Sequence, residues 1–478
     1  MSAKGLLSFV ICAHKPFARQ GENGDCAGEE GFFSAVANTY APLVDMAERL
    51  SRDNIRPAFT VSLSPSLCAM LEDEQLGGRL RSYIEAGLGD ESAAFAHLRY
   101  ESALAVLDRY SGDLVTPLKQ LQQNGQIEVI TSTATHAVLP LFIHPECSRA
   151  QVSVAGADYQ ERFSRKTRGL WLAGGAFEPR LSQYMQLAGI NYVFLPARSF
   201  ECARPKPKYG LYAPARLAGG ALAFACDAAS LEDCLSFSGS GGGVYLDCAS
   251  FGAYDAQAAS RVARAHAEYF LRRRLEQAEA ADRASGIRPV ITCACDADLF
   301  GGKWFEGLEF LEHVIRFIRQ ERLPLQMVCA GEAVEAAQAA VSGEIEPDAA
   351  SLSGGGYFEQ WLSPDNDWIY PRLNAAAEKM VELANRFQFQ DVGHIEKRAL
   401  NQAARELMLA QSSDWAMQGG GASGCGGGRV LEHCGNFDRL AAMVCARNID
   451  EAALRDMETR DNIFFNMDFR VFASASAF

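Results

Sequence analysis

The chain has 478 residues, 48% of them hydrophobic, and a formal net charge of −14 at pH 7. This length and composition predict a large buried core, in one large domain with a smaller one. The negative charge disfavours nucleic acid and anionic lipid as partners, because both are polyanions, and it leaves neutral partners open. No apolar stretch is long enough to span a membrane, and residues 1–10 are too short and wrongly flanked for a signal peptide. We therefore expect no membrane association and a cytoplasmic location.

The 14 cysteines include no Cys-x-x-Cys pair, and several lie within apolar runs. This pattern predicts reduced thiols that pack as small hydrophobic residues. Cys293 and Cys295 stand near acids and could be imagined as metal ligands, but no histidine lies beside them. The sequence therefore predicts no metal and no cofactor.

Short apolar runs alternate along the chain with longer segments of helical periodicity, a pattern typical of a parallel sheet wrapped by helices. The expected strands are residues 6–13, 58–63, 127–130, 169–172, 192–195 and 289–295. Most of these runs lead into polar or small residues, and a barrel gathers such strand ends on one face. The predicted fold is an α/β, incomplete parallel (β/α) barrel of about seven strands with a C-terminal helical domain.

Segments of helical spacing follow the strands and then dominate the end of the chain. We expect helices over residues 33–50, 256–284, 368–387, 395–412 and 429–447, a charged helical pair over 66–109, and a Gly-rich loop over 419–428. The predicted organisation is a barrel over 1–330 with a small inserted region at about 177–250, a connecting segment over 331–365, and a helical domain over 366–478.

Several residues are candidates for a sugar-handling site, and each also has a structural interpretation. His14 and His136 follow strand ends, where a histidine is more often a satisfied core residue than a ligand contact. Asp296 ends a strand but could cap the next helix, and Asp414 could cap a helix or bind sugar hydroxyls. The five tryptophans could stack on glucose rings or fill the core: Trp171, Trp304, Trp361, Trp368 and Trp415.

Spaced motifs through the chain resemble glycoside hydrolase family 57, in particular its α-1,4-glucan branching enzymes. They are Ala13-His14-Lys15-Pro16-Phe17, residues 131–136, residues 296–307, residues 400–415 and Arg460-Asp461-Asn462-Ile463-Phe464. The resemblance implies an α-glucan ligand such as glycogen or maltooligosaccharide. It also implies a retaining mechanism with two carboxylates about 5 to 5.5 Å apart, and it puts Asp296 at the acid/base position. His14, His136, Asp414 and the tryptophans are then substrate-binding candidates.

The resemblance also exposes a loss at the position of the nucleophile. The family's Trp-Leu-Pro-Glu-Cys corresponds to Trp171-Leu172-Ala173-Gly174-Gly175, so Gly174 replaces the nucleophilic Glu. Glycine has no side chain that could form the glycosyl-enzyme ester, and retaining transfer is expected to fail. Glu178 and Asp298 are possible replacements. Cys12, Gly302 and Lys303 are further departures, since the family has His, His and Trp at these positions.

The predicted function is that of an α-1,4-glucan-handling protein resembling a branching enzyme, with impaired or absent catalysis. Two alternatives stay open: an active branching enzyme or α-glucanotransferase with a displaced nucleophile, and a non-catalytic descendant that binds glucan or scaffolds a protein. If only the nucleophile has been lost, Gly174→Glu is expected to restore activity.

Overall fold

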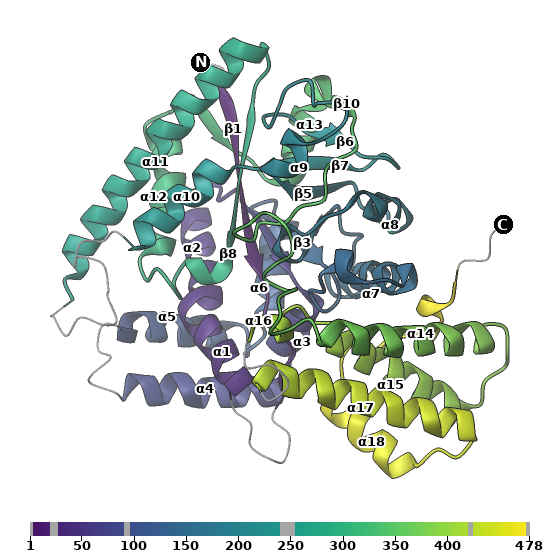
Figure 1. Cartoon of the computed structure of the whole chain (residues 1–478). Coiled ribbons are helices and arrows are strands. Elements are labelled where there is room, and N and C mark those ends of the chain that lie inside the picture. Colours follow the sequence, from purple (N-terminus) through teal and green to yellow (C-terminus); the bar gives the residue numbers. More distant parts are fainter. Residues whose placement is uncertain (1–2, 20–26, 90–95, 240–253, 419–423, 475–478) are drawn as a thin grey trace.

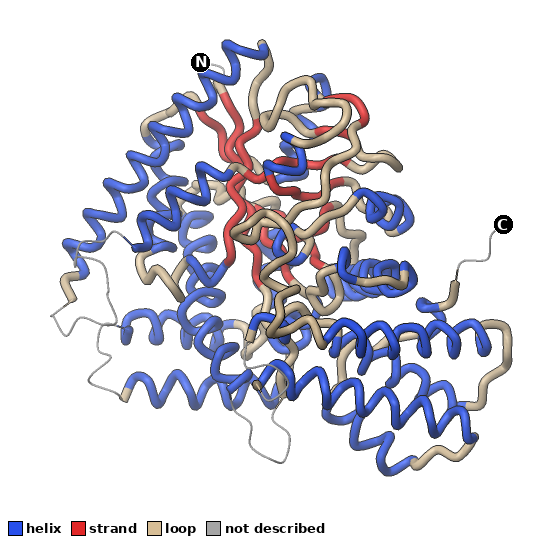
Figure 2. The backbone as a smooth tube through the Cα atoms, in the orientation of Figure 1, coloured by secondary structure: helices blue, strands red, loops and turns tan. Residues whose placement is uncertain are grey.

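Seven parallel strands form a closed ring at the centre of the molecule. The computed structural model describes residues 3–19, 27–89, 96–239, 254–418 and 424–474. Around the ring the strands follow the order β1, β2, β3, β4, β5, β7 and β8, and β8 pairs again with β1. Figure 2 shows these strands surrounded by helices. The predicted α/β barrel of about seven strands with a C-terminal helical region is thus confirmed.

The ring strands differ in length and are separated by helical segments of unequal length. They are β1 (Gly5–Ala13), β2 (Thr60–Leu63), β3 (Glu128–Ser132), β4 (Gly169–Trp171), β5 (Tyr192–Pro196), β7 (Leu222–Cys226) and β8 (Val290–Asp296). Three further strands extend the sheet: β6 (Ala215–Arg216), β9 (Leu325–Met327) and β10 (Ser342–Glu344). The ring closes at a narrow seam, where Cys226 of β7 pairs with Thr292 of β8.

The region at about 177–250 differs from the expected small insertion. Its residues up to 239 contribute β5 and β7, both strands of the ring, while 240–250 lie outside the described residues. The expected strands did not include β7, because two of the five residues in its Leu-Ala-Phe-Ala-Cys are alanine, which is depleted in strands, and none is β-branched. The β7 strand is nevertheless fully buried between its neighbours.

Helices cover the barrel on its outside (Figure 1). They are α1 (Ala27–Ala35), α2 (Ala41–Arg52), α3 (Pro65–Leu71), α4 (Glu74–Leu88), α5 (His97–Arg109), α6 (Val115–Gln123), α7 (Pro145–Phe163), α8 (Ser182–Leu187), α9 (Ala197–Glu201), α10 (Ala228–Gly239), α11 (Ala256–Ser285), α12 (Gly307–Gln320) and α13 (Ala330–Ala336). The expected helix over 33–50 is present as α1 and α2 joined by a π-helical turn. The expected pair over 66–109 is three helices, because Asp73 caps a new helix after α3.

The chain ends in a helical layer packed beneath the barrel, drawn in green and yellow in Figure 1. Its helices are α14 (Ile369–Phe387), α15 (His394–Ala410), α16 (Asp414–Met417), α17 (Cys425–Ala446) and α18 (Glu451–Arg460). A hydrophobic cluster that includes Ala173, Trp361 and Val430 joins this layer to the end of β4. No helix in the described ranges is both long and apolar enough to cross a membrane.

The Gly-rich stretch over 419–428 is only partly described, and its second half is helical rather than a loop. Residues 419–423 lie outside the described residues, whereas Gly426 and Gly427 belong to the first turn of α17. A Cβ on Gly426 would lie 2.3 Å from the carbonyl oxygen of Trp415. Glycine is therefore needed here for the close approach of α17 to α16, and this packing reason overrides the low helix propensity of glycine.

Candidate active site

His14 follows β1 and is held from both sides of its ring. Its Nδ1 lies 2.7 Å from Oγ of Ser64, the N-cap of α3, and its Nε2 lies 2.7 Å from Oδ2 of Asp414. A carboxylate can only accept a hydrogen bond, so Nε2 carries the proton that it donates to Asp414. The C-terminal helical layer therefore supplies a residue to the carboxyl face of the barrel.

His136 stacks on His14 and makes a second contact with the C-terminal layer. The two rings lie 4.0 Å apart between centroids at an angle of 17°, and Nδ1 of His136 lies 3.1 Å from Oγ of Ser413. The backbone of His136 is left-handed, with φ 54°, in the turn after β3. Two imidazole rings and one carboxylate, from three segments far apart in the sequence, thus form one polar group.

The charges of this group are set by burial and by the pairing with His14. Burial alone would raise the pKa of Asp414, but the charge and hydrogen bond of His14 outweigh that effect and hold the pKa well below its usual range. Burial and the nearby His14 lower the pKa of His136 well below that of a free histidine. At neutral pH the group therefore presents a charged Asp414 and an uncharged His136.

Asp296 is the last residue of β8, and its side chain reaches solvent on the carboxyl face of the ring. Desolvation by the surrounding protein raises its pKa, and the neighbouring Asp298 raises it further, while Lys303, His14 and Lys15 act in the opposite sense. A carboxyl group that keeps its proton to higher pH is suited to general acid catalysis. Asp296 therefore has a property that the predicted acid/base role requires.

Gly174, the residue expected at the nucleophile position, lies against the ring of Trp361. Gly174 lies in a short turn after β4 with φ +54°, a conformation that favours glycine. A Cβ built there would lie 2.3 Å from Cη2 and 2.7 Å from Cζ2 of Trp361. The Trp361 ring therefore fills the space into which any side chain at position 174 would project.

The two carboxylates considered as replacements already have partners. Glu178 forms an ion pair with Arg180, which also donates to the carbonyl oxygen of Phe142 at 2.7 Å. Asp298 accepts a hydrogen bond of 2.5 Å from Nζ of Lys15. A carboxylate held by a cation is a weaker nucleophile than a free one, so neither arrangement favours attack on a sugar.

Four of the five tryptophans are buried and offer little ring face to a sugar. Trp304 is 1% exposed and packs on Phe310 at 4.9 Å, and Trp361 is 3% exposed. Trp171 packs on Phe194 inside the barrel, and Trp415 donates from Nε1 to the carbonyl oxygen of Leu409 at 2.7 Å. Only Trp368 of the five is partly exposed. The other four tryptophans pack in the core, as their structural interpretation proposed.

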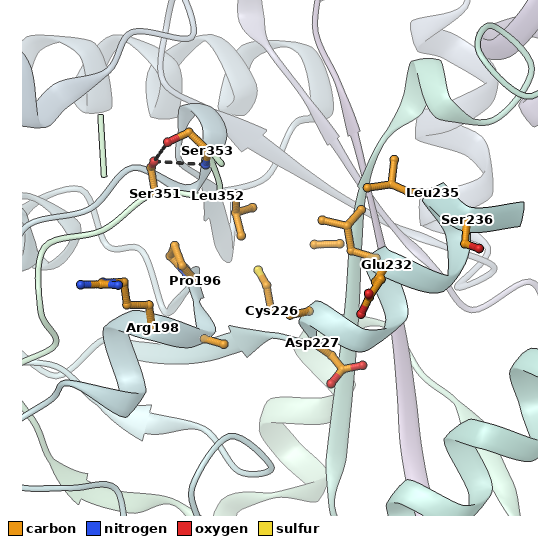
Figure 3. Close-up of a pocket in the computed structure, with 14 residues that line it drawn as sticks. Pro196, Arg198, Cys226, Asp227, Glu232, Leu235, Ser236, Ser351, Leu352 and Ser353 are labelled. Atoms are coloured by element: carbon orange, nitrogen blue, oxygen red, sulfur yellow. Dashed lines mark hydrogen bonds between the residues drawn. The ribbon is translucent and has the colours of Figure 1, made fainter. Parts of the chain in front are cut away.

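A pocket of about 620 Å³ opens beside the carboxyl ends of β5, β7 and β8 (Figure 3). Its wall is mostly small and apolar, with polar groups such as Arg198, Glu232 and Ser236. No aromatic side chain of the described residues lines it. The pocket therefore lacks the stacking platform that an apolar sugar face prefers.

Two groups around histidines have metal-ligand spacing. His14, His136 and Asp414 bring one donor atom each within 4.8 Å of one another, as do the buried Glu406, His433 and Asp461. The first group already uses its Nε2 and carboxylate for the internal hydrogen bond. In the second, His433 Nδ1 lies 2.8 Å from Oε2 of Glu406. In each group the histidine is thus hydrogen-bonded to a carboxylate of the same group.

His14, His136 and Asp414 were each predicted as site residues, but the contacts among them were not predicted. Asp414 lies 400 positions from His14, and only the docking of α16 against the barrel brings them together. Ser64, Ser413 and the contact of Trp361 with Gly174 were also missed. The motif that contains Ser412-Ser413-Asp414-Trp415 was the one indication in the sequence that this segment belongs to the site.

Comparison with known proteins places these features in a family. The sequence profile described as "Glycosyl hydrolase family 57" matches residues 8–345, and the profile "1,4-alpha-glucan branching enzyme, C-terminal" matches residues 372–472. A 1,4-alpha-glucan branching enzyme of Thermococcus kodakarensis is 26% identical over an alignment that covers 96% of this chain and 77% of that protein.

Solved structures give the same result. The GH57-type branching enzyme of Pyrococcus horikoshii has a TM-score of 0.89 at 26% identity, covering 99% of this chain and 97% of that one. The alpha-amylase AmyC of Thermotoga maritima has a TM-score of 0.86 at 28% identity, covering 98% of this chain and 99% of that one. The profile spans well over half of the chain and confirms the resemblance seen in the motifs. This chain belongs to glycosyl hydrolase family 57.

Proposed function

We propose that this protein binds α-1,4-glucan, as a branching-enzyme-type member of its family, without catalysing glycosyl transfer. The observation that carries the proposal is the contact between Gly174 and Trp361. A retaining mechanism needs a carboxylate at the nucleophile position, and here that position has neither a side chain nor the space for one. An acid at Asp296 alone cannot form the covalent intermediate.

The proposal that the protein binds glucan rests on a different group of side chains. His14, His136 and Asp414 form a hydrogen-bonded group that is partly open to solvent. Imidazole edges and a carboxylate are suited to sugar hydroxyls, which both donate and accept hydrogen bonds. Trp368 is the tryptophan with ring surface left for stacking. The proposed ligand is a neutral α-glucan such as glycogen or maltooligosaccharide.

Electrophoresis through a gel containing glycogen tests the binding. The wild type should be retarded, and His14→Ala should bind roughly 10- to 100-fold more weakly, because a hydrogen bond to a charged group contributes about 1.5–3 kcal/mol. His394→Ala, an exposed histidine at the start of α15, is the matched control and should migrate as the wild type. No retardation of the wild type at any glycogen concentration would contradict the proposal.

The contact with Trp361 also determines whether a glutamate at position 174 could restore activity. Gly174→Glu alone should not restore transfer, because the new side chain meets the Trp361 ring and requires a left-handed backbone. The informative variant is Gly174→Glu combined with Trp361→Ala, assayed for new α-1,6 branch points on amylose. Activity in the double variant, absent in either single variant, would mean that the remaining site is still competent.

An active enzyme with a displaced nucleophile is the competing function, and the raised pKa of Asp296 is the observation in its favour. It predicts branching by the wild type that disappears in Asp296→Asn. Activity in the wild type that survives this substitution would indicate a contaminating enzyme instead.

A further inference from the structure

Three buried cysteines converge between the barrel wall and its covering helices. Cys293 and Cys295 alternate along β8 with Ala294, which belongs to the cluster inside the barrel, so the two cysteines face outward. Cys234 of α10 meets them there, and the three Sγ atoms lie within 4.8 Å of one another. From the sequence we expected no metal at Cys293 and Cys295, because no histidine lies beside them; Cys234, the third thiol, comes from a distant part of the chain.

We propose that Cys234, Cys293 and Cys295 form a three-sulphur site for a soft, thiophilic cation, of which copper(I) is the physiological example. Thiolates select soft ions over hard ones. In the described residues no further His, Cys, Asp or Glu joins this group. A structural zinc ion takes four protein ligands, so a closed set of three sulphurs favours an ion that accepts three-fold coordination.

The spacing of the sulphurs fits such an ion. With metal–sulphur bonds of about 2.3 Å, two ligand sulphurs lie about 4.0 Å apart around a trigonal ion and about 3.8 Å apart around a tetrahedral one. Sγ of Cys293 and Sγ of Cys295 are 3.8 Å apart. The limit of 4.8 Å on the other separations leaves them within about 1 Å of the trigonal value, a shift that small side-chain rotations can supply.

Ordinary packing of small hydrophobic residues does not account for this convergence. Residues two positions apart on a strand are about 6.6 Å apart along its axis, so a sulphur separation of 3.8 Å means that the side chains of Cys293 and Cys295 lean toward each other. All three residues are also almost completely buried. An ion held there would be shielded from water and would exchange slowly.

The helix that carries the third thiol is fixed in place. Arg274 of α11, itself buried, donates from Nη1 to Oγ of Ser230 at 2.7 Å and pairs from Nη2 with Oδ2 of Asp233 at 3.2 Å. Both partners lie on α10 close to Cys234, so the position of this thiol opposite β8 does not depend on an ion. A site whose ligands are positioned in advance loses less entropy on binding. The ion would also tie α10 to the strand that ends at Asp296.

Titration of the reduced, full-length protein with copper(I) under anaerobic conditions, against a chromophoric competing chelator, tests the site. We expect one tightly bound copper per chain with a thiolate-to-copper charge-transfer band, and a sulphur-only first shell of three ligands by X-ray absorption. Each of Cys234→Ser, Cys293→Ser and Cys295→Ser should weaken binding by more than roughly 100-fold, because loss of an outer-shell partner alone costs about 10- to 100-fold.

Two control variants remove a thiol outside the group: Cys202→Ser, which is exposed, and Cys147→Ser, which is buried. Both should bind copper as the wild type does, and circular dichroism identifies any variant that fails to fold. Nitrogen or oxygen ligands in the first shell, or unchanged binding in a folded triple variant, would overturn the proposal. A disulfide that forms between two of the three thiols in place of copper binding, seen as a loss of two hydrogens by mass spectrometry, would overturn it in favour of a redox pair.

Discussion

Two regions at the carboxyl end of the barrel differ in how their side chains are arranged. On the side of β1 and β3, His14 is hydrogen-bonded to Asp414 and to Ser64, and His136 stacks on His14 and is hydrogen-bonded to Ser413. On the side of β4, Gly174, which we propose stands in place of the nucleophile, lies against the Trp361 ring. One end of the barrel thus combines a polar group with a tightly packed apolar contact, and substitutions in each region should differ in what they cost.

Truncation of Trp361 should be the most damaging change on the β4 side. Trp361→Ala removes a ring that is 3% exposed and packs in the cluster joining β4 to the C-terminal helices, so we expect a loss of about 3–5 kcal/mol in the free energy of unfolding. Denaturation in urea measures it. Trp361→Phe should cost much less, because the indole N–H has no hydrogen-bond partner in the described structure. Equal losses in both variants would contradict ring packing as the cause.

A side chain at position 174 should also destabilise the protein. Gly174→Ala must adopt a left-handed backbone and displace the Trp361 ring, so we expect a loss of roughly 2–4 kcal/mol. Gly189→Ala is the matched control, because Gly189 has φ +69° but open space around its Cβ position, and it should lose only about 1–2 kcal/mol. Equal losses of stability in the two variants would mean that the contact with Trp361 contributes nothing to the free energy of unfolding.

The Asp414 pair should make stability depend on pH at the acid end. Because the folded-state pKa of Asp414 lies below the unfolded value of about 3.9, the pair stabilises the fold above about pH 4 and loses that contribution as the pH falls. Asp414→Asn should cost about 1.5–3 kcal/mol at pH 7 and should flatten the acid limb of the stability profile. An unchanged acid limb, measured by urea denaturation from pH 3 to 7, would contradict the charged pair.

Replacement of Asp296 should have the smallest effect on stability. The raised pKa means that the charged carboxylate is disfavoured in the folded state, so any contribution from this group is lost as the pH rises through its folded pKa. Asp296→Asn keeps the size of the side chain and removes only its titration, and we expect a change within about 0.5 kcal/mol at pH 7. Asp298→Asn, which breaks the contact with Lys15, is the comparison. A large loss in Asp296→Asn would assign it a structural role.

The sequence predicted the barrel best where strands are rich in β-branched residues and flanked by turns, as in β1 and β8. It failed for β7, whose alanines resemble a helix, and for β9 and β10, which have three residues each. The polar candidates were found from motifs, but their contacts were not, because the approach of Asp414 to His14 depends on the docking of a whole helical layer. The same holds for Trp361 above Gly174 and for Cys234 beside β8, since tertiary packing alone creates these neighbours.

The absence of glycosyl transfer is best tested by incubating the purified wild type with amylose and counting α-1,6 branch points and reducing ends. We expect no more of either than in the Asp296→Asn variant, together with normal retardation of both proteins by glycogen. Branch points made by the wild type and abolished in Asp296→Asn would contradict it, and would mean that another carboxylate has taken over the role lost at Gly174.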